Sequence, residues 1–215
     1  MEIDERFKVT EQLDGKMLIN GKLRGSSCDQ WLESRCPATQ ELIGKVPNAS
    51  AEEMTEAVTA AKEAFRAWKK TTQKQRVALI EEIAQRLEAR ADGFAKIEAL
   101  DTGNTVGPMT NDVHKAVERM RFYCGLAYEL KGVTVPSTPE NIHLTLREPY
   151  GVVGRIIPFN HPIGFAASRL APALIAGNTI VVKPSEQAPL SASLLAEICA
   201  EVAPRGVINI VTGDR

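Results

Sequence analysis

The sequence predicts an α/β fold: a doubly wound parallel sheet, preceded by β-hairpins and a helical region. Short apolar runs at residues 152–157, 179–183 and 207–211 are typical of parallel strands covered on both faces. Helical patterns separate these runs, so the order strand–helix–strand–helix–strand indicates two right-handed crossovers. Amphipathic helical patterns precede this unit, and short strands with turn signals precede the helices.

The N-terminal segment predicts short strands. Residues 17–19 and 22–24 flank Asn20-Gly21. This pair is typical of a two-residue hairpin turn, because both turn positions need a positive φ. Residues 41–46 form a further strand candidate. We therefore expect a β-hairpin and another strand before the first helix.

Residues 50–130 predict three helical stretches. Ser50 and Glu53 form a capping box at the start of the first. The second and its continuation end near Gly103, and the third runs from about residue 111 to residue 130. Apolar residues recur at helical spacing in each stretch, which we interpret as core packing.

The segment at residues 131–149 has an extended character. Pro136 and Pro139 suit an edge segment, because proline cannot donate to a strand ladder. Residues 142–147 alternate with period two, which predicts a half-buried strand with His143 on its outer face.

Composition excludes several classes of protein. Lys and Arg number 26 and Asp and Glu 27, so the net charge of −1 argues against a nucleic-acid partner. We expect no membrane span, because no run of about 18 apolar residues occurs. The polar N-terminus resembles no signal or transit peptide, so a cytoplasmic location is expected.

The four cysteines and three histidines are too scattered for a metal site of standard spacing. We expect no metal, and we interpret the cysteines as free thiols in a reducing compartment. A disulfide between Cys28 and Cys36 is the alternative for that pair.

One polar segment follows each of the three apolar runs, at the edge where open parallel sheets bind ligands. After the second run, Lys183 can donate to ribose or phosphate oxygens. Glu186 can accept from two ribose hydroxyls and would repel a 2′-phosphate. Alternatively, Ser185 caps a helix and Glu186 lies in its first turn.

Asn160 follows the first run and lies in a loop between two prolines. A neutral amide on a rigid turn can donate to a developing oxyanion. The alternative is a turn asparagine that bonds its own backbone. The sequence names no carboxylate partner for the neighbouring His161, so we interpret His161 as a turn residue. The usual glycine-rich phosphate motifs and G-x-S-x-G are absent, so any phosphate cradle must use another geometry.

Three motifs together resemble the aldehyde dehydrogenase superfamily: GVVGRIIPFNHP, APALIAGNT and KPSE, which occur in this order. The resemblance covers nearly the whole chain and implies the fold of that family's N-terminal part. It implies that Asn160 holds the substrate carbonyl oxygen and that NAD is preferred over NADP because of Glu186. The cofactor-binding positions that it implies are Ile156, Ile157, Pro158, Phe159, Lys183, Ser185 and Glu186.

The resemblance also implies a covalent mechanism. A cysteine thiolate attacks the aldehyde, hydride passes to NAD(P), and a glutamate-activated water releases the acid. None of the four cysteines matches the nucleophile, and Arg215 stands where relatives commonly carry a glycine. We therefore expect a chain truncated before the nucleophile and the general base, which does not turn over an aldehyde by itself. A non-catalytic nucleotide-binding or interaction module is the alternative.

Three regions follow from this resemblance. Residues 1–131 would form the N-terminal hairpins and helices of the cofactor-binding domain. Residues 132–148 would form part of an oligomerisation arm, which implies a homo-oligomer in the full-length form. Residues 149–215 would form the first strands and helices of an incomplete nucleotide-binding sheet.

Overall fold

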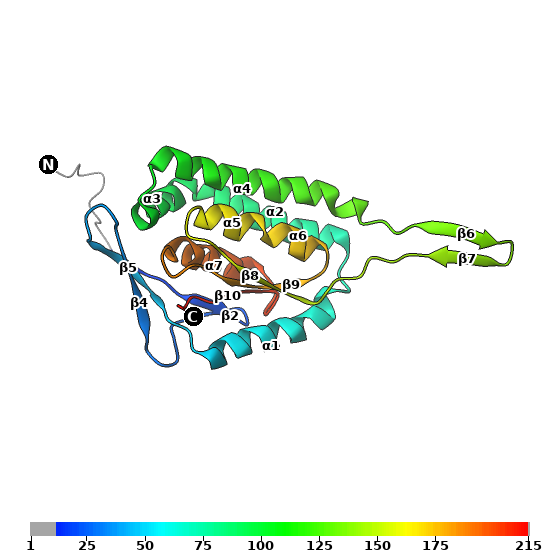
Figure 1. The fold of residues 1–215 in the computed structure, drawn as a ribbon, viewed down its shortest axis with the longest axis horizontal. Coiled ribbons are helices and arrows are strands. Elements are labelled where there is room, and N and C mark those ends of the chain that lie inside the picture. The colour runs from blue at the N-terminus through cyan, green and yellow to red at the C-terminus, as the bar shows by residue number, and fades with distance from the viewer. Residues whose placement is uncertain (1–11, 215) are drawn as a thin grey trace.

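The computed structural model describes residues 12–214 (Figure 1). Its strands are β1 (Leu13–Asp14), β2 (Met17–Ile19), β3 (Lys22–Arg24), β4 (Trp31–Arg35), β5 (Leu42–Pro47), β6 (Thr134–Thr138), β7 (Asn141–Leu144), β8 (Val152–Ile156), β9 (Thr179–Lys183) and β10 (Ile208–Ile210). Its helices are α1 (Ala51–Trp68), α2 (Gln73–Ala89), α3 (Ala91–Thr102), α4 (Val106–Leu126), the 3₁₀ turn η2 (Ala127–Glu129), α5 (Pro162–Ser168), α6 (Leu170–Ile175) and α7 (Leu190–Val202).

The central sheet has the strand order β3-β2-β10-β9-β8. Strands β8, β9 and β10 are parallel, so the predicted parallel unit with two crossovers is confirmed. The predicted hairpin also forms, and its turn residues Asn20 and Gly21 have φ values of 52° and 73°. This hairpin joins the same sheet because β2 pairs antiparallel with β10, an arrangement that the sequence analysis did not predict.

Helices cover both faces of the sheet (Figure 1). Helix α1 packs against one face, while α6 and α7 pack against the other and are covered in turn by α2, α3 and α4. Successive residues of each strand face the two layers in turn. Val181 packs in the smaller cluster on the α1 side, and its neighbours Ile180 and Val182 pack in the larger cluster on the other side.

Strand β8 differs from the prediction that its run is covered on both faces. Among the described residues it pairs with β9 alone, so it forms one edge of the sheet. Its last residue, Ile156, is 78% exposed. The apolar run that indicated a buried strand is therefore only half-buried at this edge, because no second strand of residues 12–214 lies beside it.

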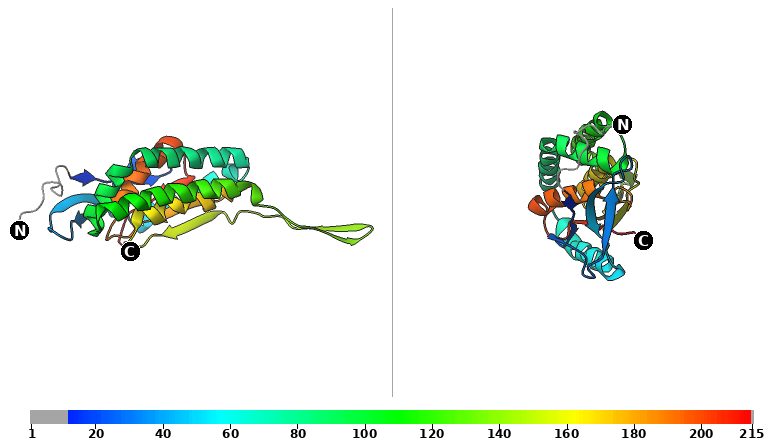
Figure 2. Two further views of the ribbon diagram at one scale, coloured as in Figure 1. Left: turned by 90° about the horizontal axis from the view of Figure 1, so that it is seen from above. Right: turned by 90° about the vertical axis from the view of Figure 1, so that its left-hand side faces the viewer.

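The segment after α4 forms a projecting hairpin of β6 and β7 (Figures 1 and 2). Every residue of both strands is exposed, so the prediction of a half-buried strand at residues 142–147 was wrong. The alternation of apolar and polar residues has no core to face, because the hairpin extends away from the other described elements. His143 is exposed, as expected.

Helix boundaries also differ from the prediction. The helical pattern after residue 162 is interrupted at Arg169, which separates α5 from α6. Helix α4 begins at Val106, earlier than predicted, and strand β4 was not predicted.

The four cysteines are free, so the alternative of a Cys28–Cys36 disulfide is wrong. No helix within residues 12–214 is long and apolar enough to cross a membrane.

Candidate functional site

Two loops begin side by side at the carboxyl edge of the parallel strands. Ile156 ends β8 directly opposite Lys183, the last residue of β9. The amide of Ile157 then donates to the backbone oxygen of Lys183 over 2.9 Å. Residues 157–161 lead from β8 into α5, and residues 184–189 lead from β9 into α7. The sequence-predicted site residues therefore lie at the start of, or within, two neighbouring loops.

The first loop presents apolar and amide groups to its surroundings. Ile156 and Phe159 are 78% and 55% exposed, and Pro158 and Asn160 are exposed as well. Ile157 differs because its side chain is only 2% exposed and packs in the large core cluster. Ile157 therefore supports the loop from the core and is not exposed on its surface.

Lys183 connects the ends of two strands. Its half-buried side chain donates from Nζ to the backbone oxygen of Gly213, beyond β10, over 2.7 Å, and to that of Pro184 over 3.3 Å. The Glu186 carboxylate lies 4.0 Å from the same nitrogen. This ion pair is solvent-exposed on the Glu186 side, so it contributes little to stability. Its carboxylate stays accessible to a ligand.

The alternative of a helix cap at Ser185 is wrong. Helix α7 begins only at Leu190, five residues later in the chain, and the Ser185 hydroxyl accepts from the Gln187 amide over 3.2 Å. The loop at residues 184–189 therefore holds Glu186 outside the helix.

Asn160 lies in the first loop with its backbone oxygen accepting from Asn104 Nδ2 over 3.2 Å. Its side-chain amide has no hydrogen-bond partner within residues 12–214. The alternative of a turn asparagine that bonds its own backbone is therefore wrong. The amide hydrogens are thus available to an external acceptor.

His161 has a carboxylate partner, contrary to the sequence-based interpretation. Its Nδ1 lies 2.5 Å from Oδ2 of Asp112, which projects from α4. The partner is 49 residues away in the chain, so no local pattern indicates it. The contact favours a proton on Nδ1 and orients the ring beside Asn160.

Two buried carboxylates behind the loops, Glu98 and Asp101, were not predicted from the sequence. Glu98 is fully buried on α3, and burial raises its pKa to about 7. Asp101 is 3% exposed one turn later, and burial raises its pKa to about 6. A signal existed in the sequence: both acids fall on the same helical face as the buried Phe94.

Three of the four cysteines have buried side chains, and the fourth lies outside both loops. Cys36, Cys124 and Cys199 are buried, and burial raises the pKa of both Cys124 and Cys199 to about 12. A catalytic thiol needs a lowered pKa and an electropositive surrounding. Cys28 is exposed in the segment between β3 and β4, far in sequence from both loops. Within the described part of the chain, no cluster of three or more potential metal-binding side chains occurs.

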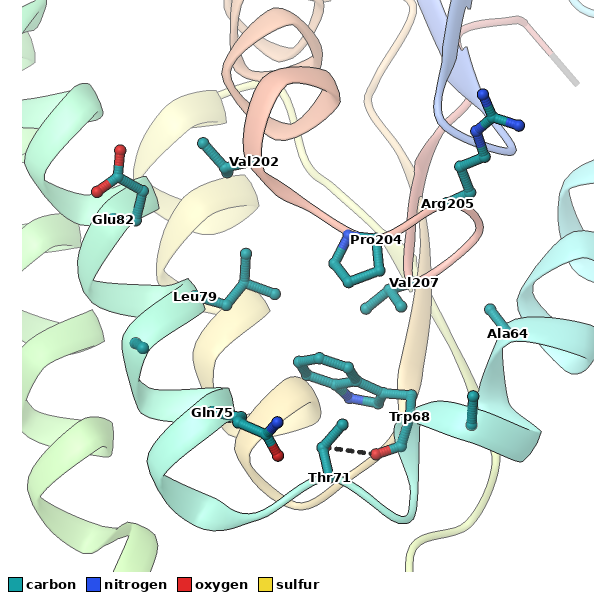
Figure 3. Close-up of a pocket in the computed structure, with 12 residues that line it drawn as sticks. Ala64, Trp68, Thr71, Gln75, Leu79, Glu82, Val202, Pro204, Arg205 and Val207 are labelled. Atoms are coloured by element: carbon teal, nitrogen blue, oxygen red, sulfur yellow. Dashed lines mark hydrogen bonds between the residues drawn. The ribbon is translucent and has the colours of Figure 1, made fainter.

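A groove of about 560 Å³ lies elsewhere, between α1, α2 and the segment that joins α7 to β10 (Figure 3). Trp68, Leu79 and Pro204 line it. The segment enters β10 at its amino end, so the groove lies at the edge opposite the two loops. Parallel sheets bind ligands at the carboxyl ends of their strands, so we favour the loops as the functional site.

Comparison with known proteins identifies the family to which the chain belongs. The model of the aldehyde dehydrogenase family matches residues 23–215. Aldehyde dehydrogenase tropH of Talaromyces stipitatus is 39% identical over 200 residues, which cover 92% of this chain and 39% of that protein.

Two solved structures are similar along most of the chain. An NAD-dependent aldehyde dehydrogenase from Sinorhizobium meliloti superposes with a TM-score of 0.92 at 32% identity, covering 98% of this chain and 42% of that one. An NADP-dependent glyceraldehyde-3-phosphate dehydrogenase from Bacillus halodurans, complexed with NADP, gives 0.89 at 32% identity, covering 94% and 44%.

The fold is thus the mixed α/β fold found in aldehyde dehydrogenase chains. This chain belongs to the aldehyde dehydrogenase family. It spans about two fifths of the length of the relatives that it matches.

Proposed function

We propose that this chain supplies the cofactor-binding loops and the oxyanion donor of an NAD-dependent aldehyde dehydrogenase. The reaction would oxidise an aldehyde to a carboxylic acid through a cysteine thiohemiacetal and hydride transfer. One observation carries the proposal: Lys183, Glu186 and Asn160 lie on adjacent loops at the carboxyl edge of a parallel sheet. Family membership supports the reaction class.

The groups on the second loop suit an adenosine ribose. Lys183 Nζ has three N–H donors, and two of them point to carbonyl oxygens of the chain. The third would donate to a ribose hydroxyl. The exposed Glu186 carboxylate accepts hydrogen bonds from ribose hydroxyls, and Ser185 would line the same loop.

The first loop would complete the cofactor groove. The exposed side chains of Ile156, Pro158 and Phe159 offer an apolar wall beside the ribose-binding loop, and the buried Ile157 supports this wall from the core. NAD, when bound, would accept the hydride from the substrate carbon.

Glu186 also supports a preference for NAD over NADP. The 2′-phosphate of NADP would place its negative charge beside the Glu186 carboxylate, and Lys183 is already 4.0 Å from that carboxylate. A ribose with two free hydroxyls would donate to this carboxylate without charge repulsion.

Asn160 would act on the aldehyde. Its side-chain amide has no partner among residues 12–214, so it can donate to the carbonyl oxygen as negative charge develops there. Losing one such donor costs roughly 10²–10³ in turnover.

The nucleophile and the water-activating carboxylate would come from outside this sequence. Two of its four thiols have strongly raised pKa values, and three are buried. We therefore expect the 215-residue chain to bind NAD but not to oxidise an aldehyde by itself.

The projecting β6–β7 hairpin supports a homo-oligomer of the full-length protein. Val135, Ile142 and Leu144 are 51%, 68% and 66% exposed on it. Clustered exposed apolar residues are typical of a surface that a second chain covers.

Calorimetric titration of the 215-residue chain with NAD and with NADP tests this proposal. We expect NAD to bind more tightly, and we expect Glu186→Gln to reduce the difference between the two cofactors. Glu140→Gln, an exposed carboxylate in the turn of the distant hairpin, is the matched control. Absence of NAD binding would refute the proposed cofactor site, and NADH formation from an aldehyde would refute the proposed role of outside residues.

A further inference from the structure

The side chain of Glu98 lies between the beginnings of two helices. Its Oε1 accepts a hydrogen bond from the amide of Ile163 over 2.7 Å and another from the Ser191 hydroxyl over 2.6 Å. Ile163 is the second residue of α5, and Ser191 is the second residue of α7. A single carboxylate oxygen thus joins the elements that follow the two candidate loops.

Neither helix has a side-chain cap of its own. The cap positions of α5 and α7 are His161 and Pro189, and neither side chain accepts from the first turn. A local serine or aspartate would satisfy each helix start without placing an acid in the core. Burying a carboxylate is costly, and Glu98 Oε2 has no hydrogen-bond partner among the described residues.

The neighbouring buried carboxylate, Asp101, binds only one of the two helix starts. Asp101 accepts from the Leu190 amide over 3.0 Å and from the Ser34 hydroxyl, so it also fastens the start of α7. Among residues 12–214 it makes no hydrogen bond to α5. Glu98 is therefore the carboxylate that links both helix starts.

We infer that Glu98 is a positioning residue that fixes the separation of the loops at residues 157–161 and 184–189. Through these loops it sets the distance between Asn160 and Glu186. Its effect on cofactor binding rests on the proposed function, whereas its effect on the two loops does not.

The test combines hydrogen exchange with calorimetry on four variants of the 215-residue chain. Glu98→Ala removes the shared acceptor, and Glu98→Gln keeps an amide oxygen in its place. Ser191→Ala removes the bond to α7 alone. Leu79→Ala is the control, because it truncates a buried side chain in the groove at the opposite edge of the sheet.

We expect Glu98→Ala to accelerate exchange at least about tenfold in both segments, 157–168 and 184–195, and to weaken NAD binding about tenfold, which corresponds to about 1.4 kcal/mol. Glu98→Gln restores both properties, because the amide oxygen accepts the same two bonds. Ser191→Ala accelerates exchange in the second segment alone. Leu79→Ala leaves both segments unchanged despite its loss of stability.

The inference is overturned if Glu98→Ala loosens one segment or neither, if Leu79→Ala loosens both equally, or if Glu98→Gln restores nothing. If the unmutated chain binds no NAD, the proposed function fails. Exchange in the two segments then decides the role of Glu98 by itself.

Discussion

The Lys183 ammonium group donates a hydrogen bond to the backbone oxygen of Gly213 over 2.7 Å. Lys183 ends β9, and Gly213 lies beyond the end of β10, so this bond joins the carboxyl ends of two parallel strands. The bond also holds the ammonium group 4.0 Å from the Glu186 carboxylate. The lysine therefore has structural contacts to two backbone oxygens and lies beside the carboxylate that we propose to bind the ribose.

Replacing this ammonium group tests its role toward the cofactor. Lys183→Met keeps most of the chain length and removes all three donors. We expect NAD affinity, measured by calorimetry, to fall at least about tenfold. Lys62→Met, an exposed lysine on α1, is the control and should bind NAD like the unmutated chain. Equal affinities of both variants would contradict the proposed ribose contact.

The buried acids predict an unusual dependence of stability on pH. Burial raises the pKa of Glu98 from 4.5 to about 7 and that of Asp101 from 3.8 to about 6. The folded state then binds more protons than the unfolded state between these values. The contribution of both groups is fully present below about pH 4 and is lost as the pH rises to about 7.

Glu98→Gln should remove most of that pH dependence. We expect the difference in unfolding free energy between pH 5 and pH 8 to shrink by roughly 2 to 3 kcal/mol. Urea unfolding at a series of pH values measures it. Glu118→Gln on the exposed side of α4 is the control. A variant whose pH profile parallels that of the unmutated chain would show that Glu98 does not titrate in this range.

Arg76 connects the ends of two helices by a buried guanidinium. It donates to the backbone oxygens of Ile175 over 3.0 Å and Lys69 over 2.9 Å, and it is 7% exposed. Arg76→Met leaves both carbonyls without a partner. We expect a loss of about 3 kcal/mol in unfolding free energy by urea titration.

Lysine should not replace Arg76, because a single ammonium cannot reproduce the fork of the guanidinium. Arg76→Lys is therefore expected to lose a similar amount of stability, and Arg66→Met on the exposed face of α1 should lose little. Full stability of Arg76→Lys would show that charge alone is needed at this position.

Thiol reactivity separates Cys28 from the other cysteines. Cys28 is the exposed thiol, and burial raises the pKa of Cys124 and Cys199 to about 12. A disulfide reagent should therefore modify one thiol quickly in the folded chain and four in urea. Cys28→Ser should abolish the fast reaction. Persistence of a fast thiol in that variant would contradict the burial of the others.

Much of the fold could be predicted because local patterns coincide with the tertiary structure. The Ser50–Glu53 capping box forms, and both turn residues of the Asn20-Gly21 hairpin adopt positive φ. What could not be predicted depends on distant partners. The exposure of β8 and of the β6–β7 hairpin reflects which elements lie beside them, and the period of a sequence carries no such information.

The candidate site, too, could be predicted from the sequence only in part. Lys183, Glu186 and Asn160 stand out because polar groups follow apolar strands. The contact of His161 with Asp112 and that of Glu98 with two helix starts join residues 49 to 93 positions apart. Such contacts arise only when α3 and α4 pack on α5 and α7.

Hydrogen exchange of the chain with and without NAD tests the central claim most directly. We predict that NAD slows exchange in the segments 156–161 and 183–187, the two loops at the carboxyl edge of the sheet. Protection confined to the groove around Trp68 and Leu79, or no protection anywhere at saturating NAD, would contradict the account.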